Sequence, residues 1–304
     1  MDRAEVVAAV FSPPPTPIPV PRPTVDASPG RRLRDAIEPL AMHSVWCEGT
    51  GDAMEALGLD FLGAYVGARA GLLGDCDPAV AVASFAVFEP SMLRATLEQA
   101  RSVRARAELL SARDAATIES LRGVLDGVDT DEIADAAAHL RRAVDGADAM
   151  ARPLFAGVVA LGWPDDDVGV LWRACEAVRE HRGDGHSAAC ATAGVGALRA
   201  NLLTETWVGM SLGSYTATRG WAEPAIAAEA ESMRAEGLLD GDELSAAGRD
   251  LRDGIERATD AAQQVLVDAL GDDLEGLLDR LGDWSARCVD ARAFPPDPFK
   301  RAAG

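Results

Sequence analysis

Aromatic side chains are scarce in this sequence. Only 5% of its 304 residues are Phe, Trp or Tyr, whereas hydrophobic residues as a whole make up 48%, with alanine and leucine dominant. The chain therefore has enough apolar side chain for a substantial core, but it must build that core from small and aliphatic groups. This composition argues against a β-sandwich and favours packed helices.

Positive charge is also in short supply. Lys and Arg number 29 against 49 Asp and Glu, which gives a formal net charge of −20 at pH 7. Nonspecific binding to DNA depends on cationic side chains that replace phosphate counterions, so a chain this acidic needs a local basic patch to contact DNA. The same deficit argues against binding to an anionic membrane surface.

Disulfides, membrane spans and a secretory signal are not indicated. The cysteines are odd in number and form no CxxC pair, so we expect buried, reduced thiols at Cys47, Cys76, Cys175, Cys190 and Cys288. No run of about 20 apolar residues predicts a transmembrane helix. No basic segment followed by an apolar one begins the chain. We therefore expect a cytoplasmic protein.

The chain divides into four parts. Residues 1–31 are predicted to form a disordered tail, because the proline density of "SPPPTPIPVPRPTVDASPG" prevents helix formation. Residues 32–165 are predicted to form an N-terminal helical domain, 166–293 a helical and winged-helix domain, and 294–304 a second tail. Apolar periodicity, polar caps and first-turn prolines predict helices over 32–47, 50–71, 78–88, 90–109, 112–126, 130–148, 150–161, 166–182, 184–210, 223–236, 245–270 and 274–293. The expected fold is therefore mainly α.

Two parts of the chain are similar enough to suggest an internal duplication. The segment "LRDAIEPLAMH", which ends at His43, aligns with "LWRACEAVREH", which ends at His181. Further on, "AMEALGLDFL" aligns with "ACATAGVGAL". A duplication would place His43 and His181 at equivalent helix ends, where they could face each other across a pseudo-twofold axis.

A helix, a short hairpin and a second helix follow one another in "TATRGWAEPAIAAEAESMRAEGLLDGDELSAAGRDLRDGIERATD". Leu239 and Glu243 flank the tight turn "DGD", and Ser245 is placed to cap the next helix. This order resembles the MarR-like type of winged helix-turn-helix over about Leu203 to Asp260. The resemblance implies that the helix before the hairpin is the one that enters the major groove of DNA.

The charges of this segment oppose that role. The predicted helix over 223–236 is rich in glutamate, and "DGDE" makes the hairpin acidic where a wing usually presents basic residues. The candidate DNA contacts are four arginines: Arg219, Arg234, Arg249 and Arg252. The sequence therefore predicts a winged helix by shape whose DNA binding is doubtful. A module used for packing or for a homodimer stays open as the alternative.

The stretch "EHRGDGH" holds two of the four histidines between two predicted helices. Gly183 is expected to end one helix and Asp184 to cap the next, which leaves His186 in its first turn. Helix N-termini attract anions, so Arg182 and a protonated His186 would form a clamp for a small anionic molecule. Acid–base catalysis by His181, a metal site and a purely structural turn stay open as alternatives. The histidine spacing lacks the i, i+4 pattern of zincins, so no metal ligands are assigned.

The segments "RPLFAGVVALGWPDDDVGVLWRACEAVREHRGDGHSAA", "TRGWAEPAIAAEAESMRAEGLLD" and "LSAAGRDLR" resemble an uncharacterised actinobacterial helix-turn-helix family, from about Arg32 to Leu281. The resemblance implies that "EPLAMH", "GWP" and "REHRGDGH" carry the ligand site, with candidates Glu38, His43, Trp163, His181, Arg182, Asp184 and His186. We therefore expect a small-ligand-binding, winged-helix regulator-like protein. The alternative is an enzyme or accessory protein of small-molecule metabolism that uses a His/Arg/Asp site on the same scaffold.

Overall fold

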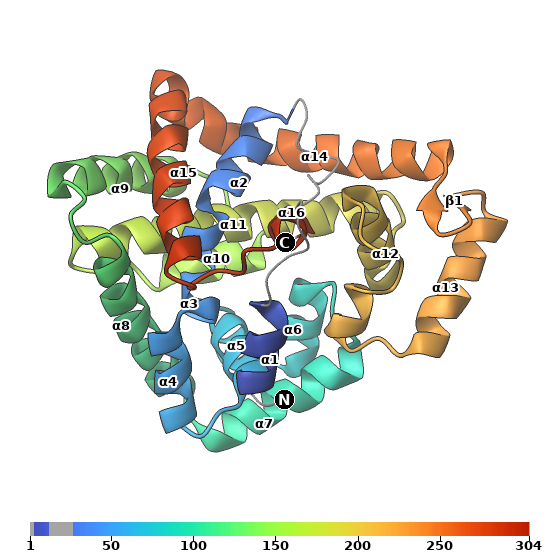
Figure 1. Cartoon of the computed structure of the whole chain (residues 1–304), viewed down its shortest axis with the longest axis horizontal. Coiled ribbons are helices and arrows are strands. Elements are labelled where there is room, and N and C mark those ends of the chain that lie inside the picture. Colours follow the sequence, from blue (N-terminus) through green and yellow to red (C-terminus); the bar gives the residue numbers. More distant parts are fainter. Residues whose placement is uncertain (1–2, 12–26, 304) are drawn as a thin grey trace.

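The computed structural model describes residues 3–11 and 27–303. These residues form the expected mainly helical protein, and the strands among them are those of one short antiparallel hairpin (Figure 1). The elements are, in chain order, α1 Arg3–Val10, α2 Pro29–Ala41, α3 His43–Trp46, α4 Glu48–Ala56, α5 Phe61–Gly71, α6 Pro78–Phe85, α7 Pro90–Val103, α8 Arg106–Val124, α9 Thr130–Asp145, α10 Pro153–Ala160, α11 Asp167–Thr192, α12 Ala197–Val208, η2 Thr216–Arg219, α13 Glu223–Ala235, β1 Leu239–Asp240, β2 Glu243–Leu244, α14 Ala246–Leu270, η3 Gly271–Asp273, α15 Leu274–Asp290 and α16 Pro298–Ala303.

Polar residues begin many of these helices. Seven of those in the described residues accept a hydrogen bond from a backbone N–H in the first turn of the helix that follows: Ser28, Asp60, Asp77, Glu89, Asp129, Asp166 and Ser245. Such caps satisfy backbone donors that have no partner inside the helix. The helix starts therefore follow from local chemistry that can be read in the sequence.

The long helix α11 lies at the centre of the molecule. It contacts α2, α9, α10 and α14, and most of its length is buried. The largest apolar cluster surrounds it, with Leu171, Trp172 and Val178 fully buried, and extends in sequence from Leu33 to Cys288. Residues on both sides of position 165, the predicted domain boundary, therefore share one core.

A smaller apolar cluster holds together the segment that carries the hairpin. Residues of α12, α13, the hairpin, α14 and α16 meet in it. Across the hairpin Leu239 pairs with Leu244 and Asp240 with Glu243, so the leucines face the cluster and the acidic residues face solvent. Figure 1 shows α13 and the hairpin at one end of the molecule, away from α8 and α9.

Several boundaries differ from the sequence-based expectations. The predicted helix over 50–71 is interrupted after α4, where Gly58 has a φ of 85° and Asp60 caps α5. The predicted tail over 294–304 contains α16, which contacts α2 and α12. Part of the predicted N-terminal tail is the helix α1, whereas its proline tract lies mostly at 12–26, outside the described residues.

The cysteines are free thiols, as expected from their spacing, and all but Cys76 are buried. Burial raises the pKa of the Cys190 thiol to about 11, so this group is protonated at neutral pH. Among the described residues, no helix combines the length and the apolarity that crossing a bilayer requires.

Candidate functional site

The "EHRGDGH" stretch is helical throughout. Helix α11 runs unbroken through it, so the expectation that Gly183 ends a helix is wrong. At Gly185 an added Cβ would lie 3.3 Å from the Cβ of Ala262, so glycine here allows α11 and α14 to pack closely. Two glycines lower intrinsic helix stability by about 0.5–1 kcal/mol each relative to alanine. The burial of α11 among its neighbours outweighs that penalty.

Asp184 caps a different helix from the one expected. Its Oδ2 accepts a hydrogen bond from the backbone N–H of Phe155, in the first turn of α10, at 2.9 Å. Burial raises the pKa of the Asp184 carboxyl to about 7, although the hydrogen bond from Phe155 acts in the opposite direction. Asp184 therefore joins α11 to α10 instead of starting a helix of its own.

The three histidines predicted for the site lie in separate environments. His43 Nε2 is 2.9 Å from Ser120 Oγ on α8. His181 stands edge-on to a phenylalanine ring at a centroid distance of 5.0 Å, and His186 Nδ1 is 3.1 Å from Thr259 Oγ1 on α14. Burial lowers the pKa of His43 and His181 to about 4 and that of His186 to about 3. All three imidazoles are therefore neutral at pH 7.

The two aligned histidines are not placed as a duplication implies. His43 begins the short helix α3, whereas His181 lies in the interior of α11. Within the described ranges, no group of three or more His, Cys, Asp or Glu side chains is placed to hold a metal ion.

Arg182 belongs to a buried ionic group between α11 and α14. Its guanidinium contacts Glu256 and lies 2.8 Å from Asp260, and Glu256 also binds Arg252 at 2.8 Å and Arg31 at 3.3 Å. Burial alone would raise the pKa of Glu256, but the arginines around it hold that pKa far below its usual range. Arg182 is thus engaged by protein carboxylates.

The remaining residues predicted for the ligand site, Trp163 and Glu38, also lie in separate environments. Trp163 donates its Nε1–H to Asp145 at 3.2 Å, and the guanidinium of Arg141 lies 5.1 Å from its ring. Glu38 on α2 is buried, and its Oε1 accepts from Arg179 Nε on α11 at 3.3 Å. The "EPLAMH" and "REHRGDGH" segments therefore meet, but Glu38 and Arg179 make the contact and the histidines do not.

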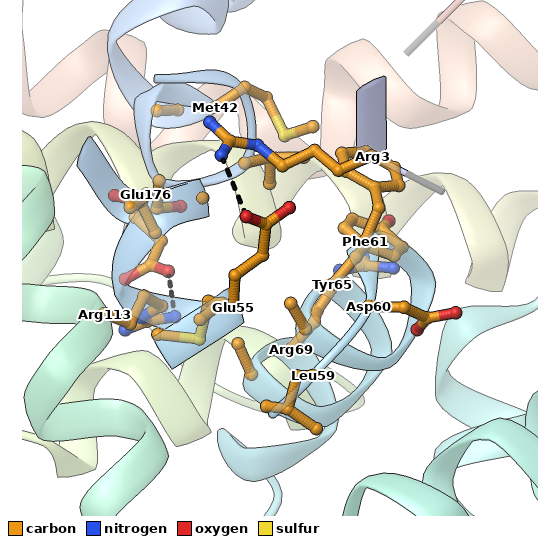
Figure 2. A pocket seen from close by; sticks show the side chains of 18 of the residues that line it. Arg3, Met42, Glu55, Leu59, Asp60, Phe61, Tyr65, Arg69, Arg113 and Glu176 are labelled. Carbon is orange, nitrogen blue, oxygen red and sulfur yellow. Dashed lines mark hydrogen bonds and ion pairs between the residues drawn. The ribbon is translucent and has the colours of Figure 1, made fainter. Parts of the chain in front are cut away.

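A cleft opens beside this contact, between α4, α5 and α11 (Figure 2). Its empty volume is about 720 Å³, counting the part that is open to solvent. Met42, Met54, Phe61 and Tyr65 contribute apolar and aromatic surface to its walls. None of the predicted histidines lines it.

The floor of the cleft is a set of ion pairs in which the glutamates are buried and Arg69 and Arg179 are partly buried. Glu180 of α11 accepts two hydrogen bonds from Arg69 of α5, at 3.0 and 2.7 Å, and one from Arg179 at 3.0 Å. One turn before Glu180 on α11, Glu176 accepts a hydrogen bond from Arg113 of α8 at 2.9 Å. Burial alone would raise the pKa of Glu180, but its two arginines hold it below the ordinary value. The cleft thus offers fixed charges of both signs beneath apolar walls.

Sequence reasoning did not select Arg69, Arg179 or Glu180 as site residues. A signal was present in α11, where Glu176 and Glu180 interrupt a run of inward-facing apolar residues. Buried acidic side chains are almost always paired, so both positions predict cationic partners. Arg69 is 111 residues from Glu180 in sequence, and only the fold identifies it as the partner.

The solvent-facing side of α13 and the hairpin is acidic. Its exposed carboxylates are those of Glu223, Glu231, Glu236, Asp240, Asp242 and Glu243. Arg234, the predicted basic contact on α13, is engaged by Glu231 at 2.6 Å and Asp242 at 2.7 Å.

The other arginines predicted to contact DNA do not offset these charges. Arg252 is buried against Glu256, so its guanidinium is withdrawn from any phosphate at the surface. Arg219 stacks on the ring of Tyr215 at 4.1 Å. Arg249 is half-buried near the start of α14. The local field around α13 therefore keeps the negative sign of the whole chain.

These features define a mainly helical protein that carries a helix–hairpin–helix segment at one end and a charged cleft in its helical body. Within this class, the chain belongs to a helix-turn-helix family, whose family model matches residues 30–295. No curated protein and no solved structure matches the sequence.

Proposed function

We propose that the protein is a small-ligand-binding, regulator-like member of this family, and that its ligand site is the cleft between α4, α5 and α11. The observation that carries the proposal is the group of charges beneath an opening to solvent, in which Glu180 is buried and Arg69 and Arg179 are partly buried. Buried ion pairs add little net stability, because desolvation offsets their attraction. Charged groups gathered under an accessible cleft are therefore better explained by binding than by folding.

The chemistry of the cleft favours a small polar molecule with an apolar portion. Guanidinium and carboxylate groups on the floor would orient the polar part, while Phe61 and Tyr65 would contact the rest. Glu38, a residue predicted for the site from the sequence, contributes by holding Arg179 in place. The cleft is better supported than an anion clamp at His181, His186 and Arg182, because those imidazoles are neutral and none of the three residues lines the cleft.

A thermal-shift screen of polar metabolites tests the ligand site. Ala64 lines the cleft from α5, so Ala64→Leu should fill it without removing a charge. Ala56 on α4 is exposed and lies outside the cleft lining, which makes Ala56→Leu the matched control. We expect at least one metabolite to raise the melting temperature of the wild type and of Ala56→Leu, but not of Ala64→Leu. Equal stabilisation of both variants, or no stabilising metabolite, contradicts the proposal.

The second part of the proposal concerns the segment from α12 to α14. The order of α13, the hairpin and α14 supports a winged helix, in which α13 would be the helix that meets the major groove. Carboxylates on that face would stand opposite the phosphates, and like charges repel. We therefore propose that this winged helix serves packing or dimerisation, and that α13 does not bind DNA.

Binding to a labelled duplex of mixed sequence tests this second part. At low salt, where electrostatic attraction is strongest, the wild type should give no shift in fluorescence anisotropy. Replacement of Glu231 and Glu236 by Arg should produce salt-sensitive binding if α13 is accessible to DNA. A salt-sensitive shift with the wild type would overturn the assignment and restore a DNA-binding role.

A further inference from the structure

The N-terminal helix α1 lies over the mouth of the cleft. Val6 and Phe11 are buried, and the Phe11 ring stands edge-on to Trp46 with ring centroids 6.1 Å apart. The guanidinium of Arg292 also lies over the Phe11 ring, 5.5 Å from its centroid. A helix of eight residues is not stable alone in water. α1 therefore owes its position to these contacts with the helical body.

Arg3, the first residue of α1, places its guanidinium in the cleft mouth (Figure 2). Its Nη1 donates to Asp52 Oδ1 at 2.6 Å, its Nη2 donates to the carbonyl oxygen of Glu48 at 2.9 Å, and Glu55 lies 3.9 Å away. The Arg3 side chain is 17% exposed, whereas those of Asp52 and Glu55 are more than half exposed. The mouth of the cleft thus holds a cation against acceptors on α4.

Gly51 forms the surface against which this guanidinium lies. A Cβ added at Gly51 would overlap the guanidinium atoms of Arg3, whereas a Cβ at Gly49, on the same helix, would have no neighbour closer than 3.8 Å. Alanine at position 51 would require the flexible end of the Arg3 side chain to shift, whereas alanine at position 49 would not. The seat for the guanidinium is therefore a defined place on α4.

The contacts that hold Arg3 are individually weak. Ion pairs between partly exposed groups contribute little to stability, and α1 is joined to the rest of the chain through a long proline-rich segment. A free molecule with the same cationic group can therefore compete with Arg3 for the acceptors on α4.

We propose that Arg3 is an intramolecular occupant of the cleft and that the mouth of the cleft is a site for small guanidinium-bearing molecules. This inference rests on the proposed ligand site and names its ligand class. A guanidinium ligand displaces Arg3, takes its hydrogen bonds to Asp52 and Glu48, and releases α1 from this contact with α4. The N-terminal helix thereby acts as a plug that raises the concentration of ligand needed for binding.

Calorimetric titration of full-length variants with agmatine tests the plug. Removing the competing side chain in Arg3→Ala raises the fraction of protein with an open site, so agmatine should bind about tenfold more tightly than to the wild type. Putrescine, which is agmatine without its amidine group, should bind Arg3→Ala much more weakly than agmatine. Equal affinity of agmatine for the wild type and Arg3→Ala, or equal affinity of the two ligands for Arg3→Ala, overturns the proposal.

The glycine pair on α4 tests the location. In the Arg3→Ala background, Gly51→Ala should weaken agmatine binding, whereas Gly49→Ala should leave it unchanged. Both changes remove a helix glycine, so their effects on intrinsic helix stability match, and circular dichroism melts confirm folding. Agmatine affinities that are equal in the two double variants overturn the assignment to the seat at Gly51.

The outcome also separates this inference from the proposed function. If agmatine fails to bind Arg3→Ala while another metabolite stabilises the wild type but not Ala64→Leu, the guanidinium site is wrong and the ligand cleft stands. If neither agmatine nor any metabolite binds, both are wrong.

Discussion

Replacing Asp184 by Asn should remove a pH dependence of stability that the buried carboxyl imposes. In the folded protein the pKa of this group is about 7, against an ordinary value of 3.8, because burial disfavours its charge. The folded state therefore binds the proton more tightly than the unfolded chain. Stability from this group is present below the ordinary pKa, is lost as the pH rises toward 7, and stays lost above it.

The magnitude follows from the size of the shift. A change in the pKa from 3.8 in the unfolded chain to about 7 in the folded protein corresponds to about 4 kcal/mol of stability lost between acid and alkaline conditions. The backbone N–H of Phe155, 2.9 Å from the carboxylate, is retained as a donor to the Asn oxygen. The change therefore removes the ionisation while keeping the contact between α11 and α10.

Urea unfolding of both proteins at about pH 5 and about pH 8 measures the effect. The free energy of unfolding of the wild type, minus that of Asp184→Asn, should fall by about 2–3 kcal/mol between the two conditions. Taking this difference cancels the other carboxylates, and Asp250→Asn, at an exposed position of α14, is the control that should show no such change. A difference that is flat or rises with pH refutes the burial of an ionisable group at this contact.

Two further substitutions test the packing of the fold by urea unfolding. Gly248→Ala should destabilise the protein by about 1–3 kcal/mol, because the new Cβ would overlap the carbonyl oxygen of Leu238. Gly254→Ala, in the same helix with no atom closer than 3.7 Å, should instead stabilise it by about 0.5–1 kcal/mol; effects of one sign at both glycines would contradict the hairpin contact. Leu140→Ala should lower the free energy of unfolding by about 2–5 kcal/mol because Leu140 is fully buried in the main core, and a loss below about 1 kcal/mol would show that this core is loosely packed.

The helices that carry clear local signals were predictable from the sequence. Asp129 and Ser245 cap α9 and α14 where their spacing predicts, and the turn between Leu239 and Leu244 is local as well. The prediction for "EHRGDGH" was wrong because Gly183 predicts a helix end, whereas α11 continues through it. Gly185 allows Ala262 of α14 to pack closely, which is a contact between distant parts of the chain.

The candidate site was less predictable than the fold. The contact between the "EPLAMH" and "REHRGDGH" segments was expected, and Glu38 takes part in it. The histidines were selected because imidazoles are common reactive groups, but burial keeps His43, His181 and His186 neutral at pH 7. The charges that reach the cleft come from helices far apart in sequence, such as Arg69 and Glu180. Such pairs depend on topology, which local patterns do not specify.

Hydrogen–deuterium exchange of the full-length protein, with and without a metabolite that stabilises it, tests the central claim most directly. The account predicts slower exchange on binding in α4, in α5 and in α11 around Glu176 to Glu180, with no change in α13 or the hairpin. Protection confined to α13 and the hairpin, or to the helices around His186, would contradict the assignment of the cleft as the ligand site.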